Sequence, residues 1–153
     1  MYLIIVVLSM LVLPIGSIWA ERAYLNADAP LMLLVGKWFV FWSVGVRLFL
    51  AGLRQFFQPR FTSEEIFGLR SDDALPLVRE LGIANLASGA VGLMSLARPG
   101  FVLPAAISAA IFYGLAGIRH VMHGGRGANQ NIAMISDLFV FLVLGAYVVS
   151  TLA

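Results

Sequence analysis

Five long apolar stretches, separated by shorter polar connectors, run along the chain. A helix needs about 20 apolar residues to cross roughly 30 Å of hydrocarbon at about 1.5 Å per residue, and each stretch reaches that length. The pattern therefore predicts an all-α, polytopic membrane bundle, a four-helix core plus an N-terminal helix, in a single domain. The five predicted transmembrane helices cover about residues 1–20, 31–57, 77–96, 101–123 and 132–152.

The first stretch, residues 1–20, has two interpretations. It is long enough for a membrane anchor, and it also ends at Ile18-Trp19-Ala20, where a signal peptide could be cleaved. No Lys or Arg precedes the apolar run, and Trp19 would sit beside the cleavage site, so the signal-peptide pattern is incomplete. We therefore expect an uncleaved transmembrane helix.

The longest connector, residues 58–76, is predicted to be a loop that contains a short helix in the membrane interface. Thr62 and Glu65 have the spacing of a capping box, which favours a helix start at Thr62. Ser71 is followed by two aspartates. Because acidic groups are stabilised near a helix N-terminus, this pattern predicts that the third transmembrane helix begins there.

Glycine marks the ends of the third and fourth helices. Pro99 and Gly100 form a turn after the third helix, and Gly124 with Gly125 is expected to stop the fourth. The glycines and Arg126 that follow the fourth helix could present a phosphate-binding loop. The Lys-Ser/Thr pair and the preceding strand of such loops are missing, so we interpret this segment as a connector only.

Composition excludes a water-soluble domain. The chain is 61% hydrophobic and 12% charged, with a mean hydropathy of +0.94, whereas soluble domains are roughly 45–50% apolar and about 25% charged. The cations are scattered rather than clustered, so no nucleic-acid partner is predicted. The absence of Cys excludes disulfides and thiolate metal sites. No metal and no cofactor is expected.

The distribution of Arg and Lys predicts the orientation, because cytoplasmic loops carry an excess of both. Six arginines lie on the side of the N-terminus and three cations lie on the other side. We therefore expect a multi-pass membrane protein with the N-terminus and the 58–76 loop in the cytoplasm and the C-terminus outside. The six are Arg54, Arg60, Arg70, Arg79, Arg119 and Arg126, and the three are Arg22, Lys37 and Arg98.

Small residues predict how the helices pack, because lipid supplies no hydrophobic drive between them and close backbone approach must replace it. Two helices joined by a tight turn each carry a row of small residues at spacings of four. We expect these third and fourth helices to form a close antiparallel hairpin at the heart of the bundle. The rows are Ala84, Ser88 and Gly92, and Ala106, Ala110 and Gly114.

Polar side chains from several helices fall at a similar depth in the half of the membrane nearer the N-terminus. Charge in hydrocarbon costs roughly 2.5–3.5 kcal/mol, so such groups pair with one another or line a wet cavity. Glu80 and Asn85 are five residues apart, about 140° around a helix, and cannot both face one neighbour. The candidate ligand-binding residues are Arg47, Glu80, Asn85, Tyr113, His120 and Asp137.

Two interpretations of this polar layer remain open. In the functional one, a hydrated cavity opens to the cytoplasm, and Asp137, Glu80 and His120 bind a polar head group or relay protons. In the structural one, ion pairs of Arg47 and Arg54 with the two acids only fix the register of the helices. His120 and His123 are three apart and could bind a metal with a carboxylate, but their place in the last turn of a helix already explains them.

Part of the chain resembles a family of small bacterial membrane proteins. The resemblance rests on the run from Arg79 to Asn85, on Gly89 and Gly92, on the run from Ala116 to His120, and on Asn129, Asn131 and Asp137. These residues resemble domain of unknown function 6790, which is itself distantly similar to DoxX-like four-helix membrane proteins. The resemblance covers about residues 38–152 and leaves the first helix as an addition. It implies a location in the bacterial inner membrane and implies that the polar positions form the site. Similarity to DoxX-like proteins implies redox or sulfur-metabolism partners.

The leading functional hypothesis is a bundle that binds a small ligand or a lipid head group in an inner-leaflet cavity, with proton exchange as a further property. A second hypothesis is a non-catalytic subunit or scaffold of a membrane complex. A third is a membrane enzyme that uses His120 and a carboxylate on a lipid substrate; since no nucleophile accompanies this pair, an enzyme is not the favoured hypothesis. A homo-oligomer is expected, because five helices enclose little space.

Overall fold

The computed structural model describes residues 2–122 and 127–153. Within these ranges all regular structure is helical, and five helices are long and apolar enough to span a membrane. The predicted all-α helical bundle with membrane-spanning helices is confirmed. The expected stop at Gly124 and Gly125 lies outside the described residues. The five helices are Tyr2–Tyr24, Leu31–Phe57, Asp72–Met94, Pro99–Met122 and Ala128–Leu152.

The first two long helices each contain a wide π-helical segment in their interior. The first consists of α1 (Tyr2–Val7), η1 (Leu8–Val12) and α2 (Leu13–Tyr24). The second consists of α3 (Leu31–Phe39), η2 (Val40–Val46) and α4 (Arg47–Phe57). The two wide segments contact each other, and the Ser43 hydroxyl donates to the backbone carbonyl of Ser9 at 3.3 Å. Such π-bulges are frequent at functional sites.

The connector after α4 forms a short helix made of α5 (Pro59–Phe61) and η3 (Thr62–Ile66). A short helix was expected here, but it begins at Pro59 and its N-cap residue, Gln58, makes no side-chain capping bond. The capping box at Thr62 is therefore wrong, because proline starts the helix three residues earlier and places Thr62 inside it.

The remaining helices follow the predicted order. Ser71 caps η4 (Asp72–Ala74) by accepting a hydrogen bond from the Asp73 backbone at 3.2 Å, which confirms the predicted helix start. This turn leads into α6 (Leu75–Met94), η5 (Pro99–Phe101), α7 (Val102–Met122) and α8 (Ala128–Leu152).

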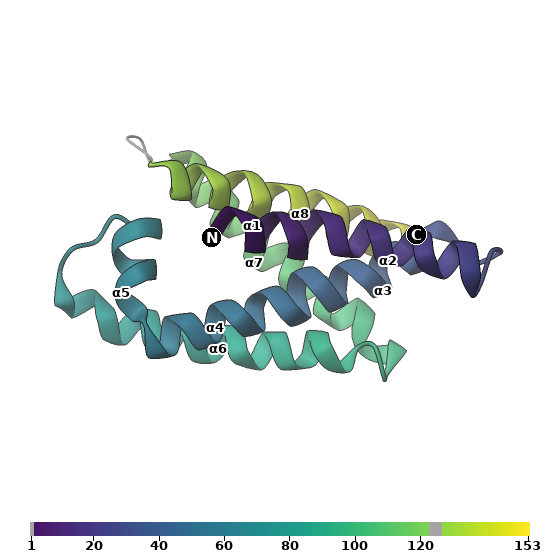
Figure 1. The fold of residues 1–153 in the computed structure, drawn as a ribbon, viewed down its shortest axis with the longest axis horizontal. Coiled ribbons are helices and arrows are strands. Elements are labelled where there is room, and N and C mark those ends of the chain that lie inside the picture. Colours follow the sequence, from purple (N-terminus) through teal and green to yellow (C-terminus); the bar gives the residue numbers. More distant parts are fainter. Residues whose placement is uncertain (1, 123–126) are drawn as a thin grey trace.

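The long helices form two pairs, with the first helix beside them (Figure 1). One pair is the second helix with α6, and the other is α7 with α8. The first helix lies between α8 and the second helix, while the short helix of α5 and η3 reaches from α4 toward α8 at the end of the bundle nearest the N-terminus (Figure 1). There the Asn129 amide donates to the Glu65 carboxylate at 3.1 Å.

The expected hairpin of the third and fourth helices is wrong, because α6 packs closely on the second helix and only lightly on α7. The buried face of α6 carries Val78, Gly82, Asn85, Gly89 and Gly92, which repeat at alternating steps of four and three. A Cβ added at Gly92 would lie 2.5 Å from the backbone nitrogen of Gly45. The glycines therefore let α6 approach the second helix rather than α7.

The small residues of α7 serve a different contact from the one expected. An added Cβ at Gly114 would meet the Phe141 ring of α8 at 2.8 Å, and one at Gly117 would meet Leu138 at 2.6 Å. Ala84 and Ser88 of α6 instead line an open groove between α6 and α7. The two rows lie on faces that do not meet.

The hydrophobic core joins four of the five long helices. Its largest fully buried side chains include Tyr113, Leu144 and Val40. Val6 and Met10 of the first helix belong to the same cluster, so this helix is packed into the bundle. Among the described residues, α6 contributes no member of the cluster, and its attachment depends on the glycine contacts with the second helix.

Hydrogen bonds and an ion pair join the first and second helices at the end of the bundle opposite the N-terminus. The Glu21 carboxylate accepts hydrogen bonds from the Lys37 ammonium at 2.8 Å and from the Trp38 indole at 2.6 Å. The Trp42 indole donates to the Ser17 hydroxyl at 3.0 Å. Lys37 is thus an ion-pair partner that fixes these two helices together.

Candidate functional site

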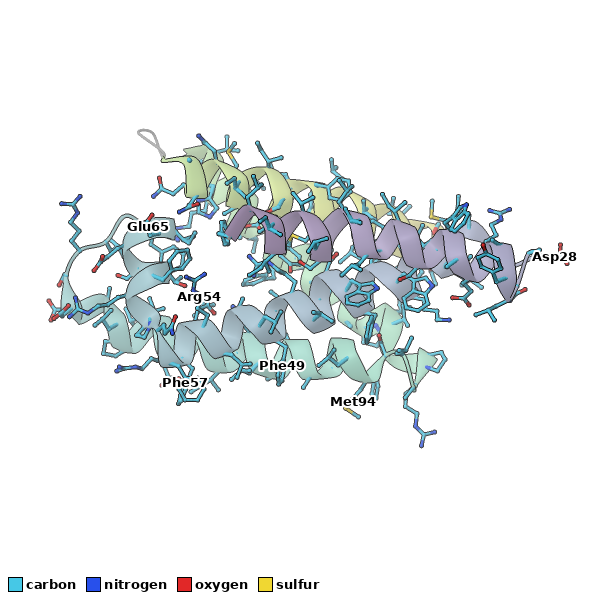
Figure 2. All side chains as sticks on the ribbon, viewed as in Figure 1. Asp28, Phe49, Arg54, Phe57, Glu65 and Met94 are labelled. Atoms are coloured by element: carbon cyan, nitrogen blue, oxygen red, sulfur yellow. The ribbon has the colours of Figure 1, made fainter. Side chains whose placement is uncertain are left out.

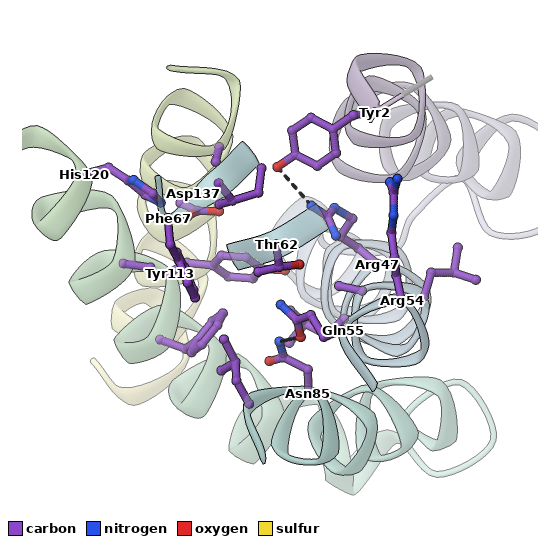
Figure 3. A pocket seen from close by; sticks show the side chains of 18 of the residues that line it. Tyr2, Arg47, Arg54, Gln55, Thr62, Phe67, Asn85, Tyr113, His120 and Asp137 are labelled. Atoms are coloured by element: carbon purple, nitrogen blue, oxygen red, sulfur yellow. Dashed lines mark hydrogen bonds between the residues drawn. The ribbon is translucent and has the colours of Figure 1, made fainter. Parts of the chain in front are cut away.

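A polar cavity of about 420 Å³ lies at the end of the bundle nearest the N-terminus. All five long helices and the short helix of α5 and η3 contribute to its lining. Figure 3 shows polar side chains converging on it from several helices. Five of the six predicted site residues line it: Arg47, Asn85, Tyr113, His120 and Asp137.

Glu80, the sixth predicted site residue, does not line the cavity; it is exposed on α6. Asn85, five residues further on, is 4% exposed and faces the cavity. The structure places these two residues on different faces of α6, as the spacing of about 140° required.

Five further polar residues, which were not among the six candidates, also line the cavity: Tyr2, Arg54, Gln55, Thr62 and Arg119. Tyr2 was missed because the first helix was treated as an addition, and Thr62 because its connector was treated as an interfacial loop. Gln55 could have been noticed, because it is a polar residue in an apolar helix. It lies about 100° around the helix from Arg54 and so faces a different neighbour. Nothing in the spacing of Tyr2 indicated that it meets Arg47.

Arg47 is incompletely hydrogen-bonded within the cavity wall. Its Nη2 donates to the Tyr2 hydroxyl at 3.4 Å, which is a long and weak bond (Figure 3). Its Nε atom is buried and has no hydrogen-bond partner among the described residues. Since a buried polar atom without a partner costs free energy, this guanidinium has unused capacity for an acceptor.

Asp137 lies on α8, across the cavity from the second helix (Figure 3). Within residues 2–122 and 127–153, no ion pair joins Asp137 or Glu80 to Arg47 or Arg54. Ion pairs between described residues are instead found between Lys37 and Glu21 and around Arg60. The charge balance proposed for the structural interpretation is therefore not formed by direct contacts in this part of the chain.

Two hydrogen bonds fix other side chains of the wall. The Asn85 amide donates to the Gln55 side-chain oxygen at 2.7 Å and joins α6 to α4. The Tyr113 hydroxyl donates to the backbone carbonyl of Ser43 at 2.5 Å and joins α7 to η2. Asn85 and Tyr113 are both buried, so these bonds hold the walls of the cavity in one geometry.

Aromatic side chains from the short helix and the turn after it lie beneath two of the arginines. The Arg54 guanidinium carbon is 3.4 Å from the centroid of the Phe61 ring, and that of Arg119 is 5.3 Å from the Phe67 ring. Cation–π contacts of this kind orient a guanidinium without neutralising its charge. The short helix thus positions cationic groups at the cavity.

The described residues contain no group of three His, Asp or Glu side chains that is suited to hold a metal. His120 and Asp137 both line the cavity. His123, the other half of the considered histidine pair, lies outside the described residues.

Residues 1–152 match a protein-family model with the description "Family of unknown function (DUF6790)". The match includes the first helix, so the resemblance seen over residues 38–152 extends further than the sequence analysis expected. No curated protein and no solved structure matches the chain. The relation to DoxX-like proteins stays a prediction.

Proposed function

Since this chain belongs to the family DUF6790, whose function is unknown, we propose from the cavity itself that it is a ligand-binding integral membrane protein. The ligand is a small molecule or a lipid head group that occupies the polar cavity. The cavity volume of about 420 Å³ lies within the range of roughly 300–1,000 Å³ that is typical of small-molecule sites. The side chains that hold the ligand are Arg47, Asn85, Tyr113, His120 and Asp137.

The observation that carries this proposal is the incomplete hydrogen bonding of Arg47. Its Nε is buried without a partner, and its hydrogen bond to Tyr2 is long. A buried hydrogen-bond donor of a cation is normally bonded to an acceptor, because its desolvation is costly otherwise. A ligand oxygen in the cavity would supply the missing acceptor.

The orientation completes the proposal. With the N-terminus and the 58–76 loop in the cytoplasm of a bacterial cell, the cavity lies in the inner leaflet of the plasma membrane. Four of the arginines used for this prediction, Arg54, Arg60, Arg70 and Arg79, belong to helix ends or connectors on the cavity side. Excess Arg near cytoplasmic helix ends supports this assignment.

Proton exchange at Asp137 is a further part of the proposal. This carboxylate lines the cavity and makes no ion pair with a described residue. Water in the cavity would give it a route for protons. The infrared carboxyl band of purified protein, followed against pH, tests this: a band that titrates and disappears in Asp137→Asn supports exchange, whereas a band that never changes contradicts it.

Retention of a ligand during purification tests the binding function. The wild-type protein, Arg47→Gln and the matched control Arg98→Gln are purified from native membranes, and their organic extracts are compared by mass spectrometry. We expect a stoichiometric compound in the wild type and in the control, and its loss from Arg47→Gln. Arg98 is an exposed arginine in the connector between α6 and η5, far from the lining residues.

The same experiment separates the alternatives. If folded wild-type protein carries no specific compound and a stable protein partner co-purifies, the scaffold hypothesis replaces ligand binding. If the extract contains a chemically altered lipid whose formation stops in His120→Gln, the enzyme hypothesis gains support. Cross-linking in native membranes tests the expected homo-oligomer, which a purely monomeric pattern would contradict.

A further inference from the structure

A second cavity of about 490 Å³ lies between α6 and α7. Its lining is mostly apolar or small, with Val91, Ala87 and Ser88 from α6 and Pro104 and Ser108 from α7. The space exists because α6 packs on the second helix and only lightly on α7. We call this space the α6–α7 groove.

The groove adjoins the polar cavity. Four residues line both of them: Leu48, Leu81, Asn85 and Phe112. Asn85 is buried at this boundary and holds Gln55 by a hydrogen bond. The groove is therefore the space next to the polar cavity, with only these shared side chains at the boundary between them.

The groove has the length of one leaflet. On α6 its lining extends from Leu81 to Val91, which is roughly 15 Å at about 1.5 Å per residue. Half of a hydrocarbon core of roughly 30 Å is the same length. Leu81 lies at the polar cavity and Val91 nearer the opposite end of the bundle, so the groove continues from the cavity toward the membrane centre.

The charges at the cavity favour an anion. Arg47 and Arg54 line it, whereas Asp137 is the one carboxylate among its described lining residues. The Tyr2 ring lies near Arg47 and the Phe61 ring near Arg54, but an aromatic ring does not neutralise the charge of a guanidinium. A guanidinium binds phosphate and carboxylate oxygens with matching geometry.

From these observations we propose that the ligand is an anionic lipid. Its phosphate-bearing head group lies in the polar cavity against Arg47 and Arg54, and one of its hydrocarbon chains lies in the α6–α7 groove. This inference rests on the proposed function and adds the class of ligand. A free anion would leave the groove empty, and a neutral lipid would leave the excess arginine charge uncompensated.

Native mass spectrometry with defined lipids tests the inference. Protein in detergent micelles doped equally with phosphatidylglycerol and phosphatidylcholine is released in the spectrometer, and the retained lipid is counted. We expect retention of phosphatidylglycerol and its loss by about tenfold or more in Arg47→Gln, because a charge-assisted hydrogen bond is removed. Arg98→Gln serves as the control for loss of a positive charge.

The chain position is tested by filling the groove. Ala84 is exposed and lines the groove, so Ala84→Phe places a ring where the chain would lie. We expect retention to fall by at least about fivefold, since overpacking opposes the chain. The neighbouring Ile83 is exposed and lines neither cavity, so Ile83→Phe is the matched control and should retain the lipid. Ala87→Leu fills the groove with a smaller group if Ala84→Phe fails to fold.

The outcomes distinguish this inference from the proposed function. If Arg47→Gln loses the lipid while folded groove variants keep it, the chain position is overturned and head-group binding stands. Equal retention of both lipids overturns the anionic class. If the wild type retains neither lipid but keeps its native compound, the lipid inference fails and ligand binding survives. If it keeps no compound at all, both fail.

Discussion

The Tyr113 hydroxyl donates a hydrogen bond to the backbone carbonyl of Ser43 at 2.5 Å, inside the π-helical segment η2. Ser43 in turn donates from its hydroxyl to the Ser9 carbonyl of η1. Three helices are therefore linked through the wide turns of the first two, directly beside the polar cavity. Tyr113 is 2% exposed, so its hydroxyl has little access to water as a substitute partner.

Replacing Tyr113 by Phe should destabilise the protein by about 0.6–2 kcal/mol, the range for hydrogen bonds between membrane helices. The ring and its packing remain, so the loss reports the hydroxyl alone. Thermal unfolding in detergent is the measurement. Ser150→Ala, which removes a local bond to the Tyr147 carbonyl within α8, is the control and should change the melting temperature less; equal effects would contradict a special role for the Tyr113 bond.

Gly92→Ala should destabilise the contact between α6 and the second helix by about 1–3 kcal/mol, as overpacking does. The added Cβ would lie 2.5 Å from the Gly45 nitrogen, and backbone cannot move aside cheaply. Gly145→Ala is the matched control, because an added Cβ there meets nothing within 4 Å. Unfolding in detergent should separate the two variants, and similar stabilities would show that the glycine contact is not tight.

Single cysteines should report the orientation, because the chain has no native Cys. Figure 2 shows Asp28 at the end of the molecule opposite Glu65, the neighbour of Glu64. We expect an impermeant maleimide to label Asp28→Cys in intact cells and Glu64→Cys only after the inner membrane is opened. The reverse pattern would place the cavity in the outer leaflet. Glu64 forms only an exposed ion pair, so its loss costs little stability.

Water in the cavity should be detectable at Ala116, which lines it from α7. We expect a water-soluble thiol reagent to modify Ala116→Cys, because a thiolate forms readily only where water reaches it. Ile118→Cys is the control, since Ile118 is 50% exposed on the same helix but lies outside the lining. In the membrane this face meets lipid and should react slowly. An unreactive Ala116→Cys in folded protein would indicate a dry, closed cavity.

Much of the candidate site followed from depth alone. Arg47, Asn85, Tyr113, His120 and Asp137 were grouped because polar groups in hydrocarbon cost free energy, and all five line one cavity. Depth did not exclude Glu80, because rotation around α6 decides which side chain faces inward, and rotation depends on the partner helix. Tyr2 and Thr62 were out of reach because their place depends on how the first helix and the short helix pack.

The amino-acid sequence by itself determined the all-helical class of the chain and its five stretches that are long and apolar enough to cross a membrane. These properties depend on the local cost of placing each side chain in hydrocarbon, which composition and periodicity record. Only the tertiary structure decided which helices pair. Ala and Gly at spacings of four permit close approach to any neighbour, and the choice of α6 for the second helix depends on complementary surfaces far apart in the chain. That choice left α6 and α7 separated and created the groove beside the polar cavity.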